Sequence, residues 1–117
     1  MRLQFLLIAL VLGATAAPMA ADARSDAKKQ VEFGISVAQR GLWREAIYRW
    51  ERAIEIDPTY APARNNLAIA YEHEGELEKA RLAYEKALEI DPNNAYIKQN
   101  YELFKEINDR TTRSESQ

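Results

Sequence analysis

The sequence has few of the residues that most often act as catalytic nucleophiles or bases or bind zinc. His73 is the only imidazole in 117 residues, and the chain has no cysteine. Nucleophilic catalysis of the Ser-His or Cys-His kind needs a paired nucleophile and base, and a multi-histidine zinc site needs several imidazoles. The four glycines are isolated from one another, so no loop resembles a phosphate-binding cradle. We therefore expect no enzyme activity, no metal site and no cofactor.

The charged residues are typical of solvated helix surfaces. Glu45 with Arg49 and Glu106 with Arg110 stand four residues apart, which is the spacing of ion pairs on one helix face. The chain has 16 Lys and Arg against 18 Asp and Glu, for a formal net charge of -2. A surface that binds phosphates needs an excess of basic residues, so we do not expect DNA or RNA as the partner.

The N-terminal residues have the layout of a secretory signal peptide. Arg2 gives the chain a positive start, residues 3–17 are mostly apolar, and Pro18 and a run of small residues follow. The alternative is an uncleaved membrane anchor, but about 15 apolar residues are fewer than the roughly 20 that span a bilayer. We expect an exported protein, either periplasmic or secreted, that is not stably inserted in the membrane once the signal peptide is removed.

The predicted end of the signal peptide is Ala23. Ala21 and Ala23 flank Asp22 in the A-x-A arrangement that signal peptidase accepts. Cleavage after Ala20 is the second choice. With cleavage after Ala23, the signal peptide spans residues 1–23 and the mature chain begins at residue 24.

The remainder of the chain repeats itself with a period of 34 residues. Residues 27–60 align without a gap on residues 61–94, and ten of the 34 aligned positions are identical. The pairs that define the register are Gly41 and Gly75, Ala46 and Ala80, Ala53 and Ala87, Ile56 and Ile90, Asp57 and Asp91, and Pro58 and Pro92. A fixed period of this length indicates stacked units that bury their apolar faces against one another.

Apolar residues recur three or four apart within each unit, which predicts α-helices. Gly41 and Gly75 are expected to end the first helix of each unit, because glycine adopts the left-handed C-cap conformation without steric cost. Pro58 and Pro92 are expected to end the second helix, since the residue before a proline is driven out of the helical region. The predicted helices span residues 25–40, 43–56, 61–74, 77–90 and 95–109, and residues 111–117 are predicted to form a disordered tail.

These residues resemble the tetratricopeptide repeat family, whose units are helix-turn-helix pairs of 34 residues. The family's small residues at positions 20 and 27 and its proline at position 32 are present in both units, as Ala46, Ala53 and Pro58 and as Ala80, Ala87 and Pro92. The resemblance implies an all-α, right-handed α-solenoid at 24–110, with units at 27–60 and 61–94 and a capping helix at 95–109. Gln30 and Arg64 depart from the family, which commonly has tryptophan at position 4, and this weakens one packing layer.

The resemblance gives the packing a physical reason. Small residues at positions 8, 20 and 27 let the helices approach closely, while bulky residues at positions 7, 11, 17 and 24 fill the remaining space. We therefore expect Phe33, Trp43 and Trp50 in the core of the first unit. Glu102 stands at position 8 of the last helix, so the array is expected to end there. The residues expected to cover the second unit are Ile97, Tyr101 and Phe104.

The resemblance also implies a concave groove, lined by the first helix of each unit. Asn66 and Asn100 occupy position 6, where the family uses asparagine to hold the main chain of an extended peptide; in the first unit this position is Glu32. An amide both donates and accepts, so this mode does not depend on the ligand's side chains. The apolar residues expected to receive ligand side chains are Ile35, Ile69 and Leu103, and the neighbouring groove residues are Asn65, Tyr96 and Gln99.

A second binding mode of the family, capture of a C-terminal carboxylate by basic residues, is not expected. Val31, Tyr96 and Asn100 stand at positions that would have to carry its basic or clamping residues. We predict a non-enzymatic module or scaffold that binds an extended peptide or a partner protein in the groove. The alternative is a self-assembling repeat protein, a homodimer or an array without a peptide ligand, because two units and a cap are fewer than the three repeats usually needed for stability.

Overall fold

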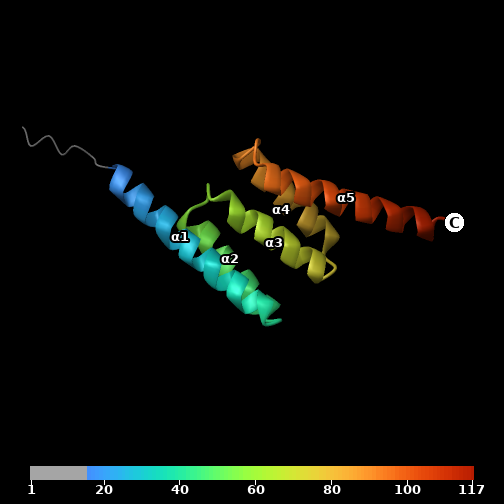
Figure 1. Cartoon of the computed structure of the whole chain (residues 1–117), viewed down its shortest axis with the longest axis horizontal. Coiled ribbons are helices and arrows are strands. Elements are labelled where there is room, and N and C mark those ends of the chain that lie inside the picture. Colours follow the sequence, from blue (N-terminus) through green and yellow to red (C-terminus); the bar gives the residue numbers. More distant parts are fainter. Residues whose placement is uncertain (1–15) are drawn as a thin grey trace, which may run out of the picture.

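The chain folds into two antiparallel helix pairs and a closing helix, as seen in a computed structural model that describes the backbone from residue 16 and side chains from residue 21 (Figure 1). The helices are α1 (Ala16–Gln39), α2 (Trp43–Ile56), α3 (Ala61–His73), α4 (Leu77–Ile90) and α5 (Ala95–Glu115). Helix α1 packs on α2, α3 on α4, α2 on α3, and α5 on α4. No strand occurs in residues 16–117, and the predicted all-α repeat solenoid is confirmed. Most of the predicted signal peptide lies outside the described residues.

Both glycines between paired helices have the expected left-handed conformation. Gly41 has φ +79° and Gly75 has φ +75°. The amide of Leu42 donates to the Val37 carbonyl at 3.0 Å, and the amide of Glu76 donates to the Tyr71 carbonyl at 2.8 Å. These bonds close the Schellman motif, in which glycine satisfies the last carbonyls of a helix and turns the chain back. The first helix of each pair therefore ends where glycine permits the reversal.

The second helix of each pair ends at an Asp-Pro sequence, as predicted. Asp57 has φ -138° and ψ 94°, outside the helical region, and α2 ends one residue earlier. Asp91 has φ -131° and ψ 77° at the end of α4. The bounds of α2 and α4 agree with the predicted 43–56 and 77–90 because a local breaker fixes each end.

The two outer helices are longer than predicted. We expected the first helix to start at residue 25, but α1 starts at Ala16. We expected helix to end at residue 109 and a disordered tail from 111, but α5 continues to Glu115. Thr111 and Thr112 donate their hydroxyls to main-chain carbonyls four residues earlier, at 3.1 and 3.0 Å. No glycine or proline interrupts these segments after Pro18, so nothing local ends the helices there.

Small residues lie at the helix crossings. The alanines at positions 20 and 27 of both units are completely buried, namely Ala46, Ala53, Ala80 and Ala87. Gly34 faces the indole of Trp50, and a Cβ added at Gly34 would collide with that ring. Trp50 is itself buried and donates its indole N–H to the Val31 carbonyl at 3.1 Å. The close packing expected in the first unit is therefore built around Trp50.

Two of the predicted core residues are less buried than expected. Phe33 is 48% exposed, although the equivalent Leu67 is 6% exposed. Leu67 packs into the core of the first unit, whereas no helix precedes α1 in the described residues to cover Phe33. The Arg49 guanidinium lies 4.3 Å from the centre of the Phe33 ring. Trp43 is half-buried and packs against the core from its edge.

Position 4 of each unit is a weak point in the packing, as the sequence indicated. Gln30 Oε1 and Arg64 Nε are buried without a hydrogen-bond partner in the described structure. An unpaired buried polar atom loses its hydration without compensation.

At the other end of the domain, Ile97 and Phe104 of α5 are buried against the second unit, with Tyr101 beside them, as expected.

Candidate functional site

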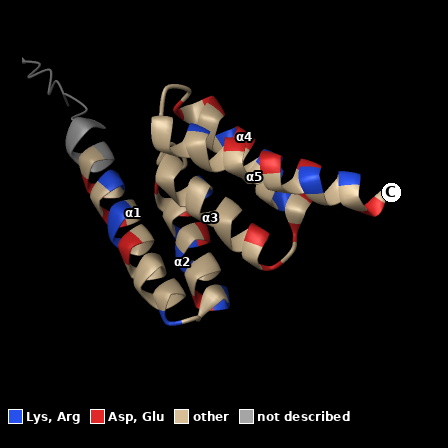
Figure 2. Ribbon diagram, turned by 45° about the vertical axis from the view of Figure 1, so that its right-hand side comes forward, with Lys and Arg blue, Asp and Glu red and all other residues tan. Residues whose placement is uncertain are grey.

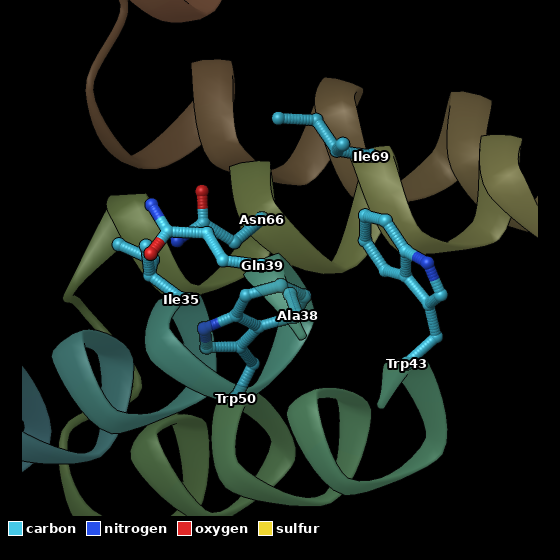
Figure 3. Close-up of a pocket in the computed structure, with 7 residues that line it drawn as sticks. All are labelled: Ile35, Ala38, Gln39, Trp43, Trp50, Asn66 and Ile69. Atoms are coloured by element: carbon cyan, nitrogen blue, oxygen red, sulfur yellow. The ribbon is translucent and has the colours of Figure 1, made fainter. Parts of the chain in front are cut away.

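A hollow of about 310 Å³ opens between α1, α2 and α3 (Figure 3). This cavity is called here the first hollow. It is lined by Ile35, Ala38 and Gln39 of α1, Trp43 and Trp50 of α2, and Asn66 and Ile69 of α3. None of these side chains is charged, and most are apolar. Ile35, Gln39 and Asn66 lie at one end of the hollow and Trp43 and Ile69 at the other (Figure 3). The first hollow can therefore accept an apolar group beside an amide.

A second hollow of about 250 Å³ adjoins the first along α1 and α3. Ile35 and Asn66 line both hollows, so they form the boundary between them. The second hollow is more polar, because Lys28, Glu32 and Asn65 contribute to it. An extended chain that crosses this boundary meets an apolar pocket on one side and polar groups on the other.

The predicted asparagines are joined to one another across two helices. Asn65 is only 1% exposed, and its Oδ1 accepts a hydrogen bond of 3.1 Å from Asn100 Nδ2 on α5. Asn65 Nδ2 in turn donates to Asn66 Oδ1 at 3.4 Å. Asn65 is therefore a buried link between α3 and α5, and one N–H of the Asn100 amide is engaged in that link. Asn66 is the asparagine that lines both hollows.

The remaining predicted groove residues divide into two groups. Tyr96 lines the second hollow and is 64% exposed. Leu103 and Gln99 are exposed on α5 but line neither hollow. The structure thus brings together Ile35, Ile69 and Asn66, and it leaves Leu103 apart from them.

His73 stacks on Trp43 at the edge of the first hollow. The ring centroids are 4.2 Å apart and the planes differ by 23°. His73 is the last residue of α3. The stack fixes the orientation of Trp43 and so shapes one wall of the first hollow.

The corresponding gap between α3 and α5 contains side chains in contact. Tyr84, the counterpart of Trp50, packs against Tyr101 and Phe104 of α5, with ring centroids 5.5 Å away in each case. Its hydroxyl donates to the Glu72 carboxylate. Burial, together with the bond to this carboxylate and its charge, raises the pKa of Tyr84 far above its ordinary value. This hydroxyl stays protonated and serves packing.

Four lining residues of the first hollow were not among the predicted groove residues: Ala38, Gln39, Trp43 and Trp50. Ala38 and Gln39 stand at positions 12 and 13 of their unit, which the family resemblance includes in the groove. The signal was therefore present in the repeat numbering. Trp43 and Trp50 were expected only in the core, yet both also line the first hollow.

The described residues contain neither a cluster placed to bind a metal nor a helix that could span a membrane. No group of three or more His, Asp or Glu side chains between residues 16 and 117 is placed to hold a metal ion. In the same part of the chain, no helix combines the length and the apolar character required to cross a bilayer.

The fold defines an α-helical repeat protein with hollows between the first helices of its units. A family model described as tetratricopeptide repeat matches residues 61–94, and a second, described as TPR repeat, matches residues 37–75. The chain belongs to the tetratricopeptide repeat family. No curated protein matches the chain.

Proposed function

We propose that this protein is a non-catalytic module that binds an extended segment of a partner protein, with one apolar side chain of the segment seated in the first hollow. Tetratricopeptide repeats generally mediate protein–protein interaction or scaffolding. The observation that supports this particular mode is the position of Asn66, whose amide borders both an apolar and a polar hollow.

The chemistry of the first hollow favours an aromatic or a large aliphatic anchor. Its volume of about 310 Å³ and its uncharged lining suit one such side chain. Among the hydrogen bonds of the described residues, Asn66 takes part only through its oxygen, so its N–H groups are free to donate to a ligand carbonyl. A ligand main chain held at Asn66 places one side chain in the first hollow and the next toward Lys28 and Glu32.

A display library of random extended peptides, selected on the immobilised protein, tests this proposal. We expect the selected peptides to share an aromatic or large aliphatic residue at one position. Synthetic copies should lose at least about tenfold in affinity when this residue is replaced by alanine, measured by calorimetry. A selection that yields no binder, or binders without such a residue, would contradict the proposal.

Ala38→Glu is the sharpest variant for this test. It gives the first hollow the residue that stands at the equivalent position 72, and a carboxylate there occupies the apolar space. We expect binding of the selected peptides to fall at least about tenfold while the circular dichroism is unchanged. Tyr48→Ala, on the exposed side of α2, is the matched control and should leave affinity as it is. Equal affinity for Ala38→Glu and the wild type would move the ligand out of the first hollow.

Self-assembly through stacked ends is less well supported by the residues at the ends. Where α3 uses Ala63 and Ala70 to pack on the preceding unit, α1 has Lys29 and Ser36, both exposed. The positions of α1 that face its own partner helix, Val31, Gly34 and Val37, are Gln99, Glu102 and Lys105 in α5. Polar outer faces are typical of capping elements in repeat arrays. Sedimentation of the chain over a range of concentrations should therefore give the mass of a monomer, and a mass that rises with concentration would favour the self-assembling alternative.

A further inference from the structure

The packed domain begins at one particular residue of α1. Arg24 Nε donates to Asp57 Oδ2 at 2.5 Å, and Arg24 Nη2 donates to Thr59 Oγ1 at 3.0 Å, both in the connection between α2 and α3. The Arg24 guanidinium also lies 5.0 Å from the centre of the Tyr60 ring. Ala27, three residues later, is completely buried. Arg24 and Ala27 therefore attach this end of α1 to the rest of the domain.

The residues immediately before Arg24 have a different environment. Ala21 and Asp22 are exposed and Ala23 is half-buried. Helix α1 runs through them without interruption. This last turn before Arg24 can unwind without uncovering the core, because its side chains are not part of any of the buried clusters.

A second helix start is encoded just after the same point. Ser25 is a residue type that caps helix N-termini, and Asp26 supplies an acidic group for a first helical turn. In the full chain these signals stand inside α1, whose own first turn has no acidic residue. A helix that begins near Ser25, once the preceding residues are removed, would use Ser25 as its cap and Asp26 as its first acidic residue.

We propose that the Ala23–Arg24 peptide bond is a processing site, cut by a signal peptidase at the membrane, and that Arg24 is the first residue of the mature protein. Water adds across the bond, so that Ala23 gains a carboxylate and Arg24 gains a free α-ammonium group. Cleavage removes none of the partners of the Arg24 side chain, which are Asp57, Thr59 and Tyr60. The position agrees with the A-x-A arrangement of residues 21–23, and the inference does not depend on the groove.

Expression of residues 1–117 in a secreting bacterial host, followed by intact mass measurement and N-terminal sequencing, tests the site. We expect one product that begins at Arg24. A product that begins at Ala21 would place the cut after Ala20 and overturn the proposed site. A product that retains residue 1 would overturn the processing itself.

Two phenylalanine variants separate the recognition of the site from a general effect of bulk. Ala23→Phe places a large residue at the last small position, and the unprocessed fraction should rise at least about tenfold. Asp22→Phe places the same residue at the unrestricted middle position and should be processed like the wild type. Normal cleavage of Ala23→Phe at the same bond would contradict the assignment.

Thermal unfolding tests the domain boundary by a separate measurement. Chains that begin at Ala21 and at Arg24 should melt within about 1 °C of each other, because no buried residue is removed between them. A chain that begins at Lys28 lacks Arg24 and Ala27 and should melt at least about 4 °C lower. Equal melting temperatures for all three chains would show that Arg24 does not mark the start of the folded domain.

Discussion

Two successive gaps on the concave side, between α1 and α3 and between α3 and α5, have equivalent positions but different contents. In the first gap Ala38 leaves space, and Trp50 directs its only polar atom back to the main chain of α1. In the second gap the equivalent residues are Glu72 and Tyr84, which bond to each other. A methyl group opposite an inward-directed indole leaves a hollow, whereas a carboxylate opposite a phenol forms a contact. The two units therefore differ in the free space beside their first helices at this pair of positions.

The surface charges do not distinguish the two gaps. Lys and Arg alternate with Asp and Glu along the outer faces of the helices (Figure 2). Many form pairs three or four residues apart, such as Arg81 with Glu85 at 2.7 Å. Exposed pairs of this kind contribute little to stability. The difference between the gaps lies in side-chain volume.

Trp50→Ala should have the largest effect, because Trp50 is both the core of the first unit and part of the wall of the first hollow. Removal of a buried tryptophan side chain costs about 3 to 5 kcal/mol of the free energy of unfolding. Urea denaturation followed by circular dichroism measures the loss. Tyr48→Ala on the same helix removes an exposed ring and should cost less than about 0.5 kcal/mol. Equal midpoints for the two variants would show that Trp50 is not the packing centre.

Alanine variants of Asn100 and Asn66 should give the next largest difference in the free energy of unfolding. Asn100→Ala leaves the buried Oδ1 of Asn65 without its donor, which should cost about 1 to 3 kcal/mol. Asn66→Ala removes only a long hydrogen bond, from Asn65 Nδ2 to Asn66 Oδ1 at 3.4 Å, and should cost less than about 0.5 kcal/mol. Peptide affinity should respond in the opposite order, since Asn66 borders the hollows. A larger stability loss for Asn66→Ala than for Asn100→Ala would contradict the assignment of the two roles.

The fold could be predicted from the sequence wherever a local residue determines the conformation. Gly41 and Gly75 adopt left-handed backbone, and the Asp-Pro pairs end α2 and α4. The outer ends of α1 and α5 could not be predicted in this way, since no breaker stands there. Phe33 was assigned to the core by its repeat position, but burial at this position is provided by a preceding helix, which the described structure does not have.

The candidate site was predicted only in part, because repeat numbering identifies a face and not the partners of each side chain. It correctly placed Asn66, Ile35 and Ile69 on one surface. It did not reveal that Asn65 and Asn100 bond to each other, since that depends on the distance between α3 and α5. It also did not reveal the hollow beside Ala38, which depends on the orientation of Trp50.

Gly34→Ala tests how the small residue and the aromatic ring are matched in each unit. Gly34 faces Trp50 in the first unit, and the second unit has Ala68 and Tyr84 at the equivalent positions. The added methyl group overpacks the Trp50 ring, at about 1 to 3 kcal/mol, while alanine returns up to about 1 kcal/mol in helix propensity. We expect a net loss of about 1 kcal/mol in urea denaturation.

The double variant Gly34→Ala with Trp50→Tyr gives the first unit the pair found in the second. Its free energy of unfolding should be at least about 0.5 kcal/mol higher than the sum of the single effects predicts. Ser36→Ala, on the exposed side of α1, is the control for helix propensity and should be neutral or slightly stabilising. Strict additivity of Gly34→Ala and Trp50→Tyr would mean that the two residues do not share space.

Arg24→Ala should have the smallest effect and the clearest dependence on pH. Burial of the Asp57 carboxylate alone would raise its pKa, but the hydrogen bonds from Arg24 and Thr59 outweigh burial and hold the pKa below its ordinary value. A carboxylate whose pKa is lowered by folding stabilises the folded state above its ordinary pKa of about 3.9, and that contribution disappears as pH falls through the lowered value. The ion pair is partly exposed, so its loss should cost no more than about 1 kcal/mol at pH 7.

The difference between wild type and Arg24→Ala should therefore be constant from pH 7 to about pH 5 and should shrink below about pH 4, as measured by urea denaturation at each pH. Asp91, the equivalent residue in the second unit, accepts from Asn94 and not from an arginine of a distant helix. Arg52→Ala removes an exposed arginine paired with Glu55 within α2, and it controls for the loss of a positive charge. If the stability difference between wild type and Arg24→Ala persisted unchanged at pH 2, Arg24 would stabilise the domain through packing on Tyr60 and not through Asp57. The reason is that, of these three side chains, only Asp57 titrates in that range.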